Sequence, residues 1–97
     1  MNQLERISRM ESYLDEAQTI MKSLSLSLAA YHEIRPKLRE LADYYSSEEW
    51  RRDFEDDEAG RLPQNLKRGV LSEDAVYNLL SDNKELLADM LSIVEQS

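Results

Sequence analysis

The sequence of 97 residues has no cysteine, only two glycines and only two prolines. The absence of cysteine excludes a disulfide scaffold, a cysteine zinc site and thiol catalysis. A phosphate-binding loop or dinucleotide fingerprint requires several clustered glycines, which Gly60 and Gly69 do not provide. No apolar run approaches the length of a membrane span, and acidic residues among the first twenty positions exclude a secretory signal. We therefore expect a soluble, cytoplasmic protein with a single domain over residues 1–97.

Basic residues are outnumbered by acidic ones, 12 against 20, and the formal net charge is −8. Nucleic acids and anionic membrane surfaces require a basic binding face, so the charge balance argues against both as partners. The charge is also uneven along the chain. Residues 36–58 and 72–97 each carry a net charge of −5, whereas residues 59–71 carry three basic side chains and no acidic one. A basic connector therefore lies between two acidic segments.

The first third of the chain has the apolar period of an amphipathic helix or coiled coil, with spacings of three and four. This seam consists of Ile7, Met10, Leu14, Ala17, Met21, Leu24, Leu28 and Tyr31. The alternating run Ser23–Leu28 is strand-like, but six residues do not outweigh the helical period on both sides. We predict a helix over residues 3–34, which Pro36 ends or kinks because its ring displaces the carbonyl four residues earlier. A short helix over residues 36–45 is expected to follow.

Residues that typically begin or end helices predict the bounds of the remaining elements. Ser46-Ser47-Glu48-Glu49 has the form of a capping box with Ser46 as the cap, which predicts a helix that reaches about Glu58 and stops at Gly60. Residues 64–68 are predicted to form one turn, with Gly69 just past its end. Ser72 is predicted to cap a final helix over residues 73–96, whose first turn carries acidic residues at the positive end of the helix dipole.

These elements predict an all-α fold. The two long helices are expected over about residues 3–34 and 73–96. At 1.5 Å per residue, the stretch from Leu4 to Tyr31 alone measures about 42 Å and the final helix about 36 Å, whereas a compact sphere of this chain is only about 32 Å across. We therefore expect an elongated antiparallel helical bundle, with two or three short helices between the long ones.

The middle of the chain resembles a known family. Its matching stretches are Pro36-Lys37-Leu38, Asp43-Tyr44-Tyr45, Glu48-Glu49-Trp50 through Gly60, Leu62-Pro63, and Leu66 through Leu80. Over residues 36–80 the chain is similar to a family of short bacterial proteins that is defined only as domain of unknown function 4298. The departures are Ser46, where the family often has glycine, and Arg51-Arg52. The resemblance implies a small, all-helical, cytoplasmic bacterial protein and provides no activity, ligand set or catalytic residues.

Aromatic and basic side chains concentrate between residues 44 and 68, where we predict a partner-binding surface. Four of the seven aromatic residues fall within eleven positions, and such residues dominate interface energetics when they are exposed. The alternative is that the aromatic residues form a small satellite core and that the basic connector pairs with the protein's own acidic faces. The predicted partner-binding residues are Tyr44, Tyr45, Trp50, Phe54, Arg61, Lys67 and Arg68.

Carboxylates support a rival prediction. Asp53 with Asp56 or Asp57 could hold one hard cation on a helix face, although a solvated face neutralised by Arg51, Arg52 and Arg61 fits the spacing better. A divalent-metal-dependent hydrolase acting on a phosphate ester would take its ligands from Glu48, Glu49, Asp53 and Asp57. His32 is the sole histidine and has no nucleophile pattern beside it, so we assign no catalytic residue.

The composition and these patterns together favour a non-enzymatic module for protein interaction or self-association. We expect it to bind an unknown protein partner or to form a homodimer through the Ile7–Tyr31 seam, and to need no cofactor and no metal. The metal-dependent hydrolase is the alternative.

Overall fold

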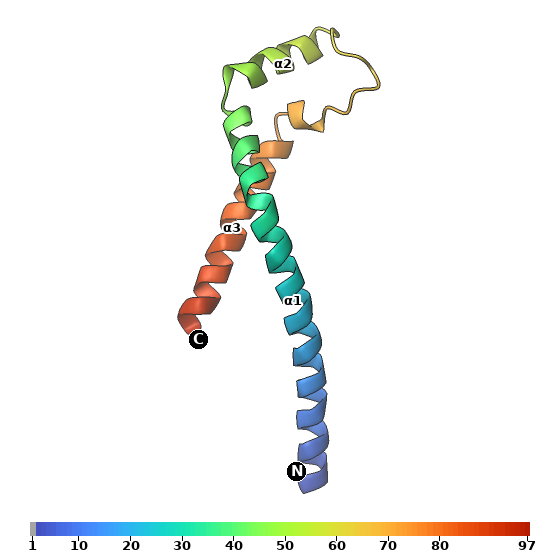
Figure 1. Ribbon diagram of the computed structural model, residues 1–97, viewed down its shortest axis with the longest axis vertical. Helices are drawn as coiled ribbons and strands as arrows, with labels where there is room; N and C mark the ends of the chain where they lie inside the picture. Colours follow the sequence, from blue (N-terminus) through green and yellow to red (C-terminus); the bar gives the residue numbers. More distant parts are fainter. Residues whose placement is uncertain (1) are drawn as a thin grey trace. The chain divides into compact units, whose positions relative to one another are not determined.

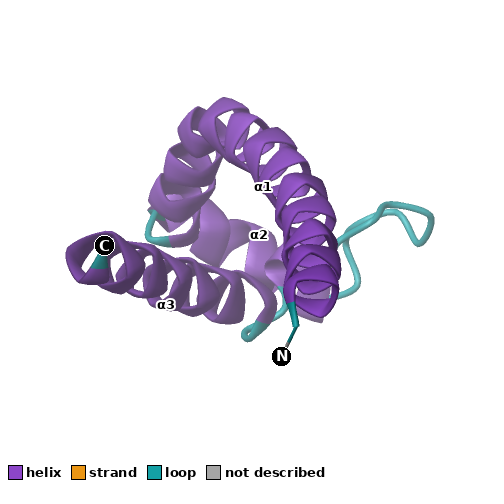
Figure 2. Cartoon of the chain, turned by 90° about the horizontal axis from the view of Figure 1, so that it is seen from below, coloured by secondary structure: helices purple, strands orange, loops and turns teal. Residues whose placement is uncertain are grey.

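The computed structural model describes residues 2–97, and these form helices joined by loops and turns (Figures 1 and 2). The three α-helices are α1 (Gln3–Tyr45), α2 (Glu48–Glu58) and α3 (Ala75–Gln96), and a 3₁₀ turn, η1 (Gly69–Leu71), precedes α3. Residues 2–97 contain no strand. The all-α prediction is therefore confirmed, with two long helices and one short α-helix between them.

Helix α1 runs unbroken through Pro36, which corrects the predicted end at residue 34 and the separate helix 36–45 (Figure 1). Proline fits helical φ, and its costs, the lost N–H donor to the His32 carbonyl and the displacement of that carbonyl by the ring, fall at one position of a 43-residue helix. The sequence from Leu28 to Glu40 offers no glycine and no Ser, Thr, Asn or Asp to cap a new helix start. The helical period also continues beyond Pro36, so the continuous helix is the best state available to this segment.

The chain divides into two compact units, one that ends at Pro36 and one that spans Lys37–Ser97. The described part of the first unit is a single helical segment, and α1 has no buried residue. The second unit contains the last turns of α1 together with α2, η1 and α3. Contacts between elements within it run from η1 to both α2 and α3.

Ser47, and not Ser46, is the N-cap of α2. Its backbone is extended, and its Oγ accepts a hydrogen bond from the backbone N–H of Trp50 at 3.2 Å. The Ser46 hydroxyl instead donates back to the carbonyl of Ala42 in α1. The predicted cap was therefore wrong by one residue. The backbone N–H of Ser46 still donates to the carbonyl of Ala42 at 3.2 Å in the pattern of α1, so the extended residue that a cap requires is the next one, Ser47.

The other end of α2 agrees with the sequence prediction. Gly60 adopts φ of 72°, and the N–H groups of Gly60 and Arg61 donate to the carbonyls of Asp57 and Asp56 at 3.0 and 2.9 Å. This is the Schellman arrangement, in which a left-handed residue closes the helix. Glycine is the residue that takes this conformation without a steric cost, so the stop at Gly60 is confirmed.

The connector from Ala59 to Ser72 differs in detail from the prediction. A turn closes from Pro63 to Leu66, where the Leu66 N–H donates to the Pro63 carbonyl at 3.2 Å. Gly69 begins η1 and does not follow a helical turn. Helix α3 begins at Ala75, two residues later than predicted, and its N-cap is Asp74 in place of Ser72. The Ser72 hydroxyl still accepts a hydrogen bond from the first helical N–H, that of Ala75, at 3.1 Å. The later start leaves the first turn of α3 without the acidic residues that were predicted there.

The core of the described chain is very small. Leu71, at 5 % exposure, and Val76, at 3 %, are its two buried residues. Both lie where η1 leads into α3, so the folded centre of the second unit is the end of the connector. No helix in the described part of the chain combines the length and apolarity that a bilayer crossing needs.

Candidate interaction site

Three aromatic rings from the end of α1 and from α2 form one half-buried cluster. The rings of Tyr45 and Trp50 meet edge to face with centroids 5.1 Å apart, and those of Trp50 and Phe54 stack at 5.2 Å. The indole N–H of Trp50 donates to the carbonyl of Val70 at 3.0 Å, and the Tyr45 hydroxyl donates to the carbonyl of Glu73 at 3.2 Å. The cluster therefore connects α2 to the connector and to the approach to α3, as the satellite-core alternative predicted.

Tyr44 lies beside this cluster and binds a carboxylate. Its hydroxyl donates to Asp53 Oδ2 at 2.5 Å, a short hydrogen bond of the charge-assisted kind. Partial burial, the hydrogen bond to Asp53 and the negative charges of Asp53 and Glu49 raise the pKa of Tyr44 to about 12. Tyr44 is therefore a neutral donor at physiological pH and holds the first turns of α2 against the end of α1.

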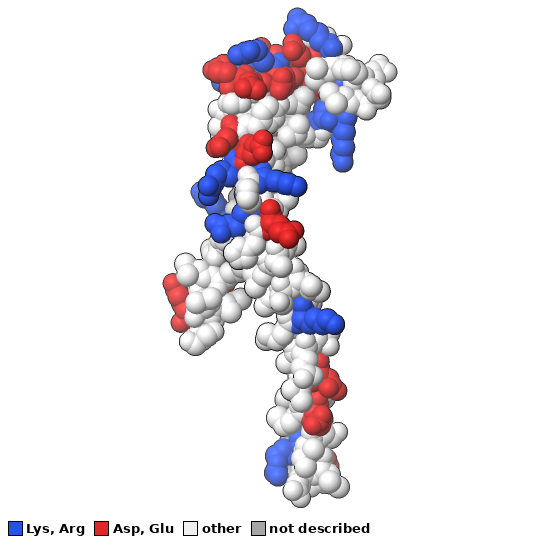
Figure 3. Space-filling model, viewed as in Figure 1, with Lys and Arg blue, Asp and Glu red and all other residues white. Residues whose placement is uncertain are grey.

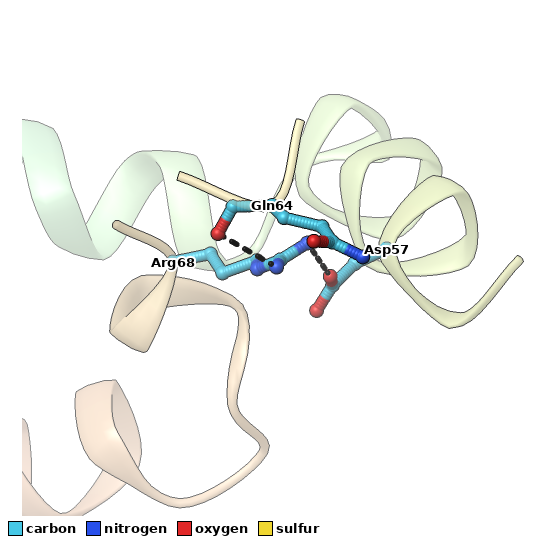
Figure 4. Close-up of polar contacts among 3 residues, drawn as sticks. All are labelled: Asp57, Gln64 and Arg68. Atoms are coloured by element: carbon cyan, nitrogen blue, oxygen red, sulfur yellow. Dashed lines mark hydrogen bonds and ion pairs between the residues drawn. The ribbon is translucent and has the colours of Figure 1, made fainter. Parts of the chain in front are cut away.

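Two of the three basic side chains in the connector pair with the acidic end of α2. Arg68 Nη1 lies 2.9 Å from Asp57 Oδ1, and a second guanidinium nitrogen donates to the carbonyl of Gln64 at 3.4 Å (Figure 4). Arg61 Nη1 lies 2.9 Å from Asp56 Oδ1. Acidic and basic side chains accordingly gather over α2 and the connector (Figure 3).

These pairs have a local physical cause. Acidic residues at the C-terminal turn of a helix face the negative end of the helix dipole, and α2 has no basic residue in its last turn. The connector provides the missing positive charge. Arg68 and Asp57 are 29 % and 25 % exposed, whereas Arg61 and Asp56 are 70 % and 42 % exposed. The Arg68–Asp57 pair is therefore the one that solvent screens less.

The seven predicted partner-binding residues thus occupy one region of the second unit, and six of them contact other parts of the chain. Lys67 is exposed and makes no hydrogen bond or ion pair with residues 2–97. Tyr44, Lys67 and Arg68 line a shallow groove of about 340 Å³. Partner binding by this region stays a prediction, while its contacts within the chain are observed.

The carboxylates of the rival hydrolase prediction do not converge. Asp53 accepts from Tyr44, and Asp57 pairs with Arg68. Glu48 and Glu49 are exposed in the first turn of α2, at the positive end of its dipole. Within residues 2–97, no three Asp, Glu or His side chains are grouped so that they could hold a metal ion.

A long exposed surface lies on α1, in the first unit. We define the apolar stripe as Leu4, Ile7, Met10, Tyr13, Leu14, Ala17, Ile20, Met21, Leu24, Leu28 and Ile34. The ten large side chains of this set are between 41 % and 77 % exposed, and they follow one face of the helix. Leu26 is also exposed, at 66 %, but lies on the opposite face.

The comparison with protein families identifies the chain. A model described as Domain of unknown function (DUF4298) matches residues 7–93. The chain belongs to this family. Curated proteins and solved structures provide no match.

The extent of the DUF4298 match adds to what the sequence motifs indicated. The resemblance was specific over residues 36–80, whereas the match covers 7–93 and so includes the apolar stripe from Ile7 onward. Membership of DUF4298 therefore applies to the stripe as well as to the aromatic and basic region.

The predicted site residues did not include this stripe. The seam spacing was visible in the sequence and suggested pairing between chains, but the same spacing is equally typical of a helix buried in its own domain. The exposed fractions of the side chains separate these two cases. The sequence also did not show that the chain divides into two units at Pro36.

Proposed function

We propose that the chain is a non-enzymatic protein-interaction module that binds an amphipathic helix through the apolar stripe of α1. One observation carries this proposal: ten large apolar side chains along one face of α1 are 41 % to 77 % exposed. Contiguous exposed apolar surface of this extent is typical of interaction sites.

The energetics of a lone helix support the same proposal. Most of the stability of helices in proteins comes from packing of an apolar face, and not from helix propensity. Each square ångström of apolar surface removed from water contributes about 25 cal/mol. The α1 segment before Pro36 has no buried residue of its own, so a bound partner would provide the packing that stabilises it.

The spacing of the stripe supports a helical partner. Residues at alternating intervals of three and four form the seam of a coiled coil, in which each side chain inserts between four residues of a facing helix. A strand or an irregular loop does not match this period over several turns. The stripe is also edged by polar residues, among them Glu11, Gln18 and His32, which suit the rim of a two-helix interface.

The proposal also includes the cellular location and the class of ligand. We propose a cytoplasmic bacterial protein with a protein partner, and neither nucleic acid nor membrane as a ligand. The net charge of −8 supports the exclusion of both anionic ligands. The aromatic and basic region of the second unit then has the function of holding α2 and the connector in place.

Site-specific photo-crosslinking in the cell of origin tests the proposal. A benzophenone amino acid in place of Ile20, at the edge of the stripe, is expected to form a covalent adduct with another polypeptide. The same amino acid in place of Leu26, on the opposite face, is the matched control and is expected to form none. Absence of an adduct at position 20, or equal adducts at both positions, would contradict the proposal.

A further inference from the structure

We propose that the helix bound by the apolar stripe is the same segment of a second copy of this chain, in antiparallel orientation. This inference rests on the proposed function, because it names the partner of that surface. The argument follows from the seam residues, the distribution of charge and the size of the exposed face.

An antiparallel pair brings together unlike residues of the seam. With Ala17 opposite Met21 of the second copy, Leu14 lies opposite Leu24 and Met10 lies opposite Leu28. Every one of these layers is apolar. The small side chain of Ala17 faces a long, adaptable methionine, which fills the space that the alanine leaves.

A parallel, in-register pair places each seam residue opposite itself. Ala17 would face Ala17, which leaves a thin layer between the larger layers of Leu14 and Met21. Interiors pack at crystal-like density, and unfilled space lowers stability. The packing of the seam therefore favours the antiparallel orientation.

The charge distribution favours the same orientation. Residues 1–36 carry four basic and five acidic side chains, a net charge of −1, whereas residues 37–97 carry eight and fifteen, a net charge of −7. A parallel pair would bring the two strongly acidic parts to the same end of the paired helices. An antiparallel pair separates them, which lowers their electrostatic repulsion.

One ion pair between the two copies favours the parallel orientation, but it contributes less than the packing and the charge separation that favour the antiparallel one. In the parallel register Arg6 would approach Glu11 of the second copy, and exposed pairs of this kind contribute little. In the antiparallel register Glu11 faces Ser25, and Ile20 faces Ile20 across the two-fold axis. That register therefore adds apolar contact at the centre and brings no like charges together.

The exposed face is large enough for a stable dimer. If each of the ten large side chains loses on the order of 70 Å² to the partner, two copies bury about 1,400 Å² in total, within the range of specific interfaces. The near-neutral charge of residues 1–36 removes the repulsion that would otherwise oppose self-association. A second copy therefore satisfies both the chemistry and the size of the stripe.

Sedimentation of the purified full chain tests self-association. We expect a dimer whose dissociation constant rises at least about 100-fold in Leu24→Gln, because each dimer loses two seam leucines. Leu26→Gln makes the same chemical change on the opposite face and is expected to sediment as the parent chain does. Trp50 fluorescence checks that the second unit of each variant is folded. A monomer at high concentration, or equal weakening by both variants, would overturn the proposal.

Distance measurements between spin labels test the orientation. The chain has no cysteine, so Ser8→Cys and Ser23→Cys each provide one labelling site on the outer face of α1. In the antiparallel register Ser8 lies level with residue 30 of the second copy and Ser23 with residue 15, which gives axial offsets of about 33 and about 12 Å. A longer distance at position 8 than at position 23 is expected. Equal distances at the two positions would overturn the antiparallel orientation.

The two sets of experiments fail in different ways. A crosslinked adduct at position 20 that contains another protein, together with a monomer in sedimentation, would overturn the second-copy proposal and support the interaction function. Absence of any adduct at position 20 in cells would contradict the interaction function itself. A crosslinked adduct made of two copies of this chain supports both.

Discussion

The indole N–H of Trp50 donates a hydrogen bond to the backbone carbonyl of Val70 at 3.0 Å, across twenty residues of sequence. This contact joins α2 to the residue that precedes the buried Leu71. It places the connector beside the aromatic cluster.

Replacing Trp50 by phenylalanine tests the value of this hydrogen bond. The variant keeps an aromatic ring near Tyr45 and Phe54 but leaves the Val70 carbonyl without its donor. We expect the free energy of unfolding of the second unit to fall by about 1 to 2 kcal/mol, from the lost bond and the smaller ring. Urea denaturation followed by circular dichroism measures it, with Trp50→Ala expected to lose more. No change in the phenylalanine variant would show that the bond contributes nothing.

The Arg68–Asp57 pair is expected to be worth more than the Arg61–Asp56 pair. A double-mutant cycle with Arg68→Gln and Asp57→Asn should give a coupling energy of about 1 kcal/mol, because these side chains are partly buried. The matched cycle with Arg61→Gln and Asp56→Asn should give about 0.5 kcal/mol or less, since that pair is exposed. Urea midpoints at low and high salt measure both, and a reversed order would contradict the assignment.

The raised pKa of Tyr44 predicts a pH dependence at the alkaline end. The neutral phenol is the form that Asp53 stabilises, so this contribution to stability is complete below about pH 10 and is lost as the pH rises towards about 12. The difference between the ultraviolet titrations of the parent chain and Tyr44→Phe isolates this group. We expect its midpoint near pH 12, and a lower midpoint in Asp53→Asn. A difference curve centred near pH 10 would contradict the hydrogen bond.

Pro36 is predicted to limit the helicity of α1. Pro36→Ala restores the donor to the His32 carbonyl and should stabilise the helix by up to about 3 kcal/mol, reduced by about 0.4 to 1 kcal/mol because the unfolded chain gains freedom. Pro36→Gly should gain less, since glycine is about 1 kcal/mol less favourable in a helix than alanine. Circular dichroism at fixed protein concentration should rank the variants in the order alanine, glycine, proline. Lower helicity in the alanine variant would contradict this account.

Local rules predicted much of the fold. The helix stop at Gly60 depends on the backbone of two or three residues, which the sequence specifies directly. The cap of α2 was misplaced because Ser46 and Ser47 are equivalent by local rules. They differ in backbone conformation, since the Ser46 N–H continues the bonding pattern of α1 and Ser47 is extended. Helix α1 continues through Pro36 because the neighbouring sequence has no residue suited to end one helix or begin another. The rule that proline ends a helix does not take these neighbours into account.

The candidate site was predicted less completely, because its contacts join distant residues. Arg68 and Asp57 are eleven residues apart, and their pairing depends on how the connector turns back on α2. The charge pattern indicated that the basic connector could pair with the protein's own acidic residues. It did not indicate which carboxylate each arginine contacts. The exposure of the apolar stripe depends on what the rest of the chain covers, which the seam spacing alone does not show.

The division of the chain at Pro36 has a calorimetric consequence. Two units that share one continuous helix but have separate contacts need not melt in one cooperative step. Heating should then give a transition of the N-terminal segment that shifts with protein concentration if it is held by a second copy, and another of residues 37–97 that does not. If the proposed assembly holds, Pro36 separates a segment whose stability depends on protein concentration from a segment whose stability does not.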